Sequence, residues 1–338
     1  MRWRRAVGVI LLLSALMSAL VLARSALADN MLRLLRPADL SALPLFVMEH
    51  EHLIERTAEA MGLGAIKVTW SAPASGDTIE ALPAGQADLV FADLVPFLIA
   101  ADAAVGARAE LRAIGAVAQR PYVLVTRNPA VRTIRDFTAA DRIAVPALKI
   151  SGPAVMLEMA AAQEWGIEQF DKLNRLVVAR PDIAAAAALQ SPKPDISAHF
   201  SRSPQADIEL SDPSIHRVMD SFDIAGPHSS GVLVTTARFR AANRELVKAI
   251  LSALQEADDF IKRSPGAAAE IFASMAKDQD IPLEDLSDMI GDPDLAYAAA
   301  PAGVLRLADF LHRTGRLKRR PGSWHELFVP EARDLAGN

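Results

Sequence analysis

Short apolar runs rich in β-branched residues alternate with longer amphipathic segments, and this alternation constrains the fold more than any other feature. Strands are predicted at residues 31–36, 67–70 and 87–92, and helices at residues 43–60, 77–84 and 95–104. Alternation of this kind is typical of a mostly parallel sheet with helices on both faces. The first third of the chain therefore predicts one α/β lobe.

The pattern starts again after residue 120. Strands are predicted at residues 122–126, 142–145, 176–179, 195–199, 217–219 and 232–236, and helices at residues 152–165 and 181–190. From residue 238 the chain is predicted to be helical, over residues 240–262, 265–275, 283–290 and 302–313. We therefore predict two lobes of similar α/β architecture, which agrees with about two domains for 338 residues.

The composition excludes several classes of protein. A chain that is 51% hydrophobic and 23% charged is globular, and the absence of cysteine excludes disulfides, thiolate metal sites and cysteine nucleophiles. Residues 1–28 carry four arginines and no acid, so the rest of the chain has 32 basic and 41 acidic residues, a net charge of −9. Such an acidic protein is a poor nucleic-acid binder.

The N-terminal segment predicts export. Residues 1–28 combine a basic start, an apolar run over residues 6–23, and small residues Ala26 and Ala28 on either side of Leu27. This is the pattern of a signal peptide cleaved after Ala28. An uncleaved membrane anchor is the alternative, because the apolar run reaches the length of about 18 residues that a spanning helix needs. Either way the protein is expected to work in the periplasm.

Polar and small residues gather where the predicted strands end. Ligands of open α/β sheets bind outside the carboxyl ends of the strands, and helix N-termini there favour anions or polar acceptors. Two lobes whose strand ends face each other predict a binding site for a small molecule between them. The strand-end segments are residues 39–41, 71–77, 92–94, 147–151, 180–182, 199–203 and 226–230.

Several segments carry a family resemblance. Residues 80–88 read EALPAGQAD, residues 126–129 read TRNP, residues 196–200 read ISAHF, and residues 323–328 have the form SW..LF. Together with LPLFV at 43–47, IRDF at 134–137 and DRIAVP at 141–146, they are similar to the solute-binding receptors of nitrate/sulfonate/taurine (NitT/TauT) ABC importers. The resemblance covers about residues 29–330.

The resemblance implies a bilobal periplasmic-binding-protein fold, type II-like, with a two-strand hinge near residues 119–127 and 232–236. Lobe 1 would hold residues 29–120, lobe 2 residues 121–235, and residues 236–338 would return to lobe 1. Such a receptor is not an enzyme and needs no cofactor. It would bind a small ligand as a monomer and deliver it to an importer permease that has a cytoplasmic ATPase.

Candidate ligand-binding residues in lobe 1 offer hydroxyls, carboxylates and close backbone approach. The carboxylate of Asp77 would select a ligand that carries an amine or a ring N–H, and Asp93 follows a predicted strand in a ligand-facing position. Helix capping is the alternative role for Ser41, Asp77 and Asp93. The candidates are Ser41, Ser75, Gly76, Asp77, Thr78 and Asp93.

Candidates in lobe 2 add a cation and imidazoles. Lys149 would neutralise an anionic group, and His199 with the adjacent Phe200 would hydrogen-bond and stack on a planar ligand. The alternatives are a solvated loop lysine and a histidine packed in the core. The mixture of acidic and basic candidates favours an organic ligand with charges of both signs over nitrate. The candidates are Lys149, Ser151, His199, Ser201, His228 and Ser229.

Other functions have weaker support. His50, Glu51 and His52 fall in a predicted helix, where residues two apart point to different faces, so we expect no metal site there. The sequence has no zinc-protease, nucleophile-elbow or P-loop motif. The basic residues from Arg313 to Arg320 are expected to form a solvated tail, or to touch a permease or anionic lipid. A periplasmic sensor partner of a receptor kinase and a thiamine-pyrimidine-synthase-like enzyme are the alternative functions.

Overall fold

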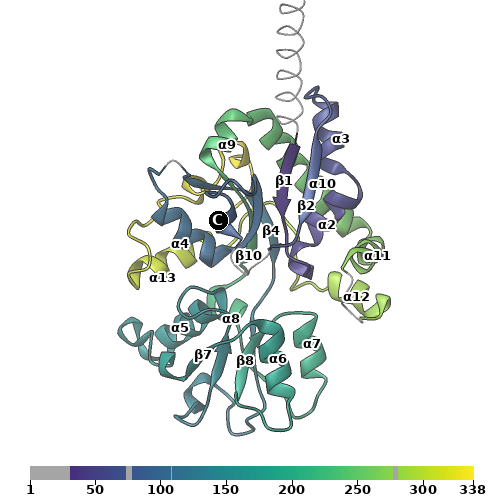
Figure 1. Ribbon diagram of the computed structural model, residues 1–338. Coiled ribbons are helices and arrows are strands. Elements are labelled where there is room, and N and C mark those ends of the chain that lie inside the picture. The colour runs from purple at the N-terminus through teal and green to yellow at the C-terminus, as the bar shows by residue number, and fades with distance from the viewer. Residues whose placement is uncertain (1–30, 74–77, 108, 277–280) are drawn as a thin grey trace, which may run out of the picture.

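The computed structural model describes residues 31–73, 78–107, 109–276 and 281–338. The predicted signal peptide, residues 1–28, and the candidates Ser75, Gly76 and Asp77 lie outside the described residues. The described residues form two α/β lobes, one above the other in Figure 1, each built around its own five-stranded sheet. The predicted bilobal α/β fold is therefore confirmed.

Lobe 1 has the strand order β2-β1-β3-β10-β4. β1 pairs in parallel with both β2 and β3, whereas β10 runs antiparallel to β3 and β4. The strands are β1 (Met31–Leu35), β2 (Lys67–Ser71), β3 (Leu89–Asp93), β4 (Leu111–Gln119) and β10 (Ser229–Thr236).

Helices cover both faces of this sheet (Figure 1). One face carries α2 (Leu43–His50), α3 (Leu53–Ala60), α10 (Arg244–Arg263), α11 (Pro265–Met275) and α12 (Leu283–Ile290), which pack on one another. The other carries α4 (Leu94–Ala103) and α13 (Val304–Arg313). The short α9 (Ala237–Ala242) joins β10 to α10.

Lobe 2 has the strand order β7-β6-β8-β5-β9. β6 pairs in parallel with β7 and β8, and β5 runs antiparallel to β8 and β9. The strands are β5 (Val123–Thr126), β6 (Ile143–Val145), β7 (Val177–Ala179), β8 (Ala198–Ser201) and β9 (His216–Asp220). The helices are α5 (Gly152–Trp165), α6 (Asp182–Gln190), α7 (Gln205–Leu210) and α8 (Ser221–Ala225).

The chain passes between the lobes twice. It crosses to lobe 2 between β4 and β5, at residues 120–122, and returns between α8 and β10, at residues 226–228. The expected second crossing at residues 232–236 is wrong, because these residues lie inside the sheet of lobe 1, and lobe 2 ends before residue 229 rather than at 235. β10 starts three residues before its apolar run, and it includes Gly231, where a Cβ would lie 2.2 Å from Phe91 Cζ, so only glycine fits there.

Two further differences have local causes. The helix predicted over residues 43–60 is divided into α2 and α3 at His52, whose φ of 51° is left-handed. β4 was not predicted because its alanines dilute the β-branched pattern. The small residues are needed there, since a Cβ at Gly115 would lie 3.0 Å from Leu254 of α10.

One acidic side chain lies in the core of lobe 1. Asp258 of α10 is 3% exposed, and its Oδ2 accepts a hydrogen bond from the backbone N–H of Ala299 at 2.7 Å. Its Oδ1 has no hydrogen-bond partner among the described residues. Burial disfavours the carboxylate and raises the pKa of Asp258 to about 8.

This pKa predicts how stability depends on pH. The folded state binds a proton at Asp258 more tightly than the unfolded state, so the free energy of unfolding should fall as pH rises from about 4 to 8. Asp258→Asn should remove this fall and stabilise the protein at pH 8 by on the order of 2–5 kcal/mol. Urea unfolding at pH 5 and pH 8 measures the effect, with the exposed neighbour in Asp259→Asn as control. An equal pH dependence in wild type and Asp258→Asn would contradict the prediction.

Candidate ligand-binding site between the lobes

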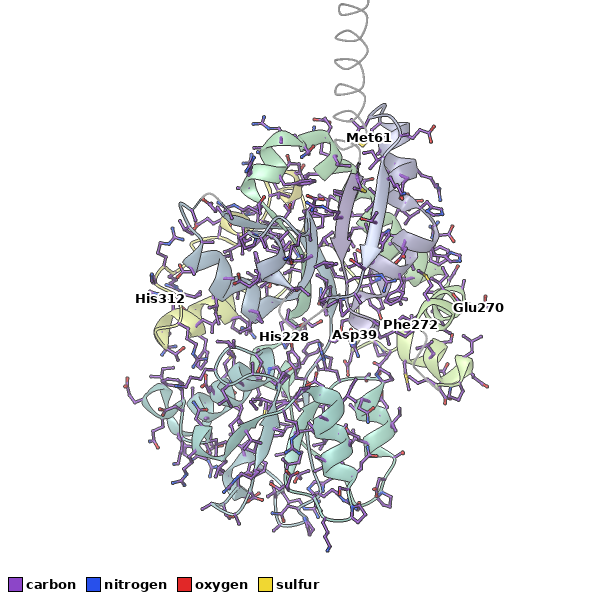
Figure 2. All side chains as sticks on the ribbon, in the orientation of Figure 1. Asp39, Met61, His228, Glu270, Phe272 and His312 are labelled. Atoms are coloured by element: carbon purple, nitrogen blue, oxygen red, sulfur yellow. The ribbon has the colours of Figure 1, made fainter. Side chains whose placement is uncertain are left out.

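The strand ends of the two lobes face each other. An ion pair joins Asp93, the last residue of β3 in lobe 1, to Arg202, the first residue after β8 in lobe 2, with 3.8 Å between Oδ1 and Nη1. Figure 2 shows Asp39, which follows β1, and His228, which precedes β10, at the boundary between the lobes. The predicted site between the lobes is therefore where the structure brings charged groups of both lobes together.

Charged and phenolic side chains gather at this boundary, and we call them the interlobe cluster. They influence one another electrostatically: each other member shifts the pKa of Asp93, of Arg120 or of both. Arg202 lies at the centre, 3.3 Å from Asp182 Oδ2 and 5.5 Å above the centre of the Tyr122 ring. The members are Asp39, Asp93, Asp182, Arg120, Arg202, Tyr122 and Tyr297.

Asp93 is the cluster member best placed for a ligand. It precedes α4 with the backbone of an N-cap, yet its side chain makes no capping hydrogen bond. The side chain is 36% exposed, but desolvation raises its pKa to about 6, and Asp39 and Asp182 add to the rise while Arg202 and Arg120 oppose it. A carboxylate that is both accessible and desolvated lies in a recess of the surface. The side chain of Asp93 therefore does not cap α4, and ligand binding by Asp93 stays a prediction.

Ser41 supports an arginine of the cluster. Its buried hydroxyl accepts a hydrogen bond of 2.8 Å from Nη1 of Arg120, and its backbone N–H donates to Asp39 Oδ1 at 2.8 Å. Desolvation lowers the pKa of Arg120. The hydroxyl of Tyr297 donates to the carbonyl of Leu40, the residue before Ser41, at 3.0 Å. Ser41 thus positions Arg120 through its hydroxyl and Asp39 through its backbone N–H.

Tyr122 is held between two side chains. Its ring stacks on His228, with centres 5.9 Å apart, while Arg202 lies over the ring. His228 Nε2 is 3.0 Å from the hydroxyl of Ser221, which also accepts from the backbone N–H of Tyr122. Burial lowers the pKa of His228 to about 4, so the ring is neutral at neutral pH. His228 therefore packs and orients Tyr122.

Three predicted hydroxyls bond to nearby backbone. Thr78 donates to the carbonyl of Phe91 at 2.6 Å, and Ser151 donates to that of Ala147 at 2.6 Å. Ser229 is buried and accepts from the N–H of Ala302 at 3.0 Å. These hydroxyls hold strand ends and loops in place.

Lys149 lies on a loop and differs from the cluster in its surroundings. The residue is exposed, with a left-handed φ of 66°. Its carbonyl accepts a hydrogen bond of 3.2 Å from Arg316 Nη1. No interaction of its ammonium with the interlobe cluster appears in the described structure.

His199 and Ser201 lie inside lobe 2. His199 is 1% exposed, and its Nε2 is 2.7 Å from Oε1 of the buried Glu209 in α7. Ser201, two residues along β8, is also buried. Side chains alternate along a strand, so residue 202 points the other way, toward Asp93. The expectation that His199 stacks on the ligand therefore has no support from its position.

Most members of the interlobe cluster were not among the predicted site residues. Asp182 and Arg202 lie in the strand-end segments 180–182 and 199–203, so an earlier signal existed for both. Arg120 and Tyr122 lie on the first crossing, and they are buried because the chain passes from one lobe to the other there. Tyr297 lies far along the chain, in a segment with no motif.

The basic segment near the C-terminus is solvated in part, as expected: Arg313, Lys318, Arg319 and Arg320 are exposed, whereas Arg316 is not. Arg316 pairs with the buried Glu158 of α5 in lobe 2, Arg319 pairs with Asp102 and Arg320 with Asp309. Arg316 thus links the C-terminal segment to lobe 2, away from Asp93 and Arg202.

The described residues contain no cluster of metal-ligating side chains and no membrane-spanning helix. Within residues 31–73, 78–107, 109–276 and 281–338, no group of three or more His, Cys, Asp or Glu side chains is arranged to hold a metal ion. His50 and Glu51 instead contact each other, with 2.8 Å between Nδ1 and Oε1. Over the same residues no helix combines the length and the apolar character needed to cross a bilayer.

Comparison with solved structures identifies the fold. The aliphatic sulphonate binding protein SsuA of Escherichia coli superposes with a TM-score of 0.67 at 18% identity, covering 88% of this chain and 98% of that one. The alkanesulfonate-binding protein SsuA of Xanthomonas axonopodis pv. citri, bound to MOPS, gives 0.65 at 22%, covering 89% and 97%. The nitrate-binding protein NrtA of Synechocystis PCC 6803 gives 0.67 at 15%, covering 89% and 86%.

These neighbours are periplasmic binding proteins, and the chain shares their fold. No protein-family model and no curated protein matches the sequence.

The packing of Tyr122 predicts the effect of one methyl group. A Cβ at Gly152 would lie 2.5 Å from the Tyr122 hydroxyl, so Gly152→Ala should displace the ring and destabilise the protein by about 1–3 kcal/mol. Gly266→Ala is the matched control, because Gly266 also lies in the first turn of a helix but its Cβ would meet nothing closer than 3.8 Å. Urea unfolding measures both variants. Equal stability of the two would contradict the packing described for Tyr122.

Proposed function

We propose that the protein is an extracytoplasmic solute receptor, which binds a small polar organic ligand between its lobes and delivers it to the permease of an ABC importer. The observation that carries the proposal is the interlobe cluster. Its carboxylates and guanidiniums come from the strand ends of both lobes, where ligands of α/β sheets bind.

The fold supports this proposal. Neighbours of the same fold are binding proteins for sulfonates and nitrate, and another is described as the ligand-binding component of an ABC-type import system in Staphylococcus aureus. These neighbours are binding proteins and not enzymes. The predicted signal peptide supports a periplasmic location.

The proposed mechanism is closure of the lobes around the ligand. A ligand shifts an equilibrium between open and closed forms only through contacts that differ between them, and a site made from both lobes supplies such contacts. We propose that Asp39, Asp93 and Asp182 with Arg120 and Arg202 orient the ligand. Ser41 would hold Arg120, and His228 would hold Tyr122.

Ligand binding is testable by thermal unfolding of the purified protein against sulfonates, nitrate, carboxylates, pyrimidines and amines. A ligand at 100 times its Kd adds about 2.7 kcal/mol, which should raise Tm by about 2 °C or more. Arg202→Gln removes one charge of the cluster and should change the ligand concentration needed for half of the rise by about tenfold or more, whereas Arg175→Gln on lobe 2 should keep it. A bound compound whose stabilisation is the same in Arg202→Gln and wild type would contradict binding at the interlobe cluster.

A further inference from the structure

We infer that the ligand of the interlobe cluster carries a positively charged nitrogen, an ammonium or a protonated heterocycle, with Asp93 and Asp39 as its counterions. This inference rests on the proposed function as a solute receptor and names the class of solute. This class differs from the sulfonates and nitrate for which the structural neighbours are named.

The charges of the cluster do not balance. Among the described residues that act on Asp93 there are two further carboxylates, Asp39 and Asp182, and two guanidiniums, Arg120 and Arg202. With every group ionised, three negative charges face two positive charges. A monovalent cation would bring this set to neutrality, whereas an oxyanion would add to the excess of negative charge.

Both arginines already have partners within the protein. Arg202 is shared between Asp93 at 3.8 Å and Asp182 at 3.3 Å. Arg120 donates to the hydroxyl of Ser41 and lies in the field of Asp39. An oxyanion that bound Arg202 would compete with Asp93 and Asp182 for its guanidinium, and Asp93 would lose its counterion in a desolvated position, which is costly.

The carboxylates, in contrast, keep free acceptor capacity. Asp93 makes no capping hydrogen bond, and its contact with Arg202 is longer than a hydrogen bond. Asp39 accepts one hydrogen bond, from the N–H of Ser41 to Oδ1. An ammonium has donors only, so it matches these oxygens without displacing a protein contact.

The pKa of Asp93 gives the sign of the pH dependence. Desolvation raises it to about 6, while Arg202 is the strongest charge acting on it and lowers it, and Asp39 and Asp182 raise it further. Below that pH, Asp93 becomes neutral and the cluster loses one negative charge. Affinity for a cation should therefore fall between pH 7.5 and pH 5, while affinity for an anion would rise.

The test uses a metabolite extract divided on a cation-exchange resin at low pH. The retained fraction holds compounds with a protonated nitrogen, and the flow-through holds anions and neutral compounds. Protein that has been unfolded and refolded to remove bound solute is heated with each fraction. We expect Tm to rise with the retained fraction only, and to rise less at pH 5 than at pH 7.5.

Variants assign the effect to named carboxylates. Asp93→Asn and Asp39→Asn should each raise the amount of retained fraction needed for half of the Tm rise by about 10- to 100-fold, since each removes a charged acceptor. Asp93→Glu keeps the charge and should lose much less, which separates a counterion from a purely structural residue. The exposed Asp259→Asn on α10 is the control and should behave as wild type.

The outcomes separate this inference from the proposed function. A Tm rise with the flow-through, alone or beside the retained fraction, overturns the inference and leaves the receptor function standing. No rise with either fraction overturns both. A rise with the retained fraction that is unchanged in Asp93→Asn and Asp39→Asn also overturns the inference, because the positive charge would then be bound elsewhere.

Discussion

The contact between Asp93 and Arg202 is the interaction on which the geometry of the site depends, because it joins the strand ends of the two lobes. It is a long contact: the charged atoms are 3.8 Å apart, beyond the distance of a hydrogen bond. A long direct contact leaves the closure of the lobes to the ligand, which is what a receptor that must also release its solute requires.

A second set of contacts between the lobes lies away from Asp93. Arg316 pairs with Glu158, Phe310 of α13 packs against Phe170 of lobe 2 with ring centres 6.2 Å apart, and Arg306 donates to the carbonyl of Ala225. This carbonyl directly precedes the second crossing at residues 226–228. α13 therefore braces the region about which the lobes would turn.

The sequence predicts the lobes because apolar periodicity and short strands are local properties, and the exact bounds of α5, α11 and α12 follow from them. The sequence does not predict β4, because the small residues of this strand are required by packing against α10, which lies far along the chain. In the site, the sequence predicts Asp93 because this residue directly follows a strand. The sequence pointed to His199 and not to Arg202 as a site residue. The local pattern does not show which side chains near the end of β8 turn into lobe 2, where His199 contacts Glu209 of α7, and which turn toward Asp93, as Arg202 does. Tyr297 reaches the site only through the tertiary fold.

The central claim, that both lobes close on a ligand at the interlobe cluster, is tested most directly by measuring the distance between them. The chain has no cysteine, so a pair introduced by Asp285→Cys on α12 and Asp207→Cys on α7, both exposed, carries spin labels at these positions alone. Ligand that raises Tm should shorten and narrow the distance distribution in wild type, and Asp93→Asn should need about 10- to 100-fold more ligand for the same change. A distance that stays unchanged while Tm rises would contradict the account.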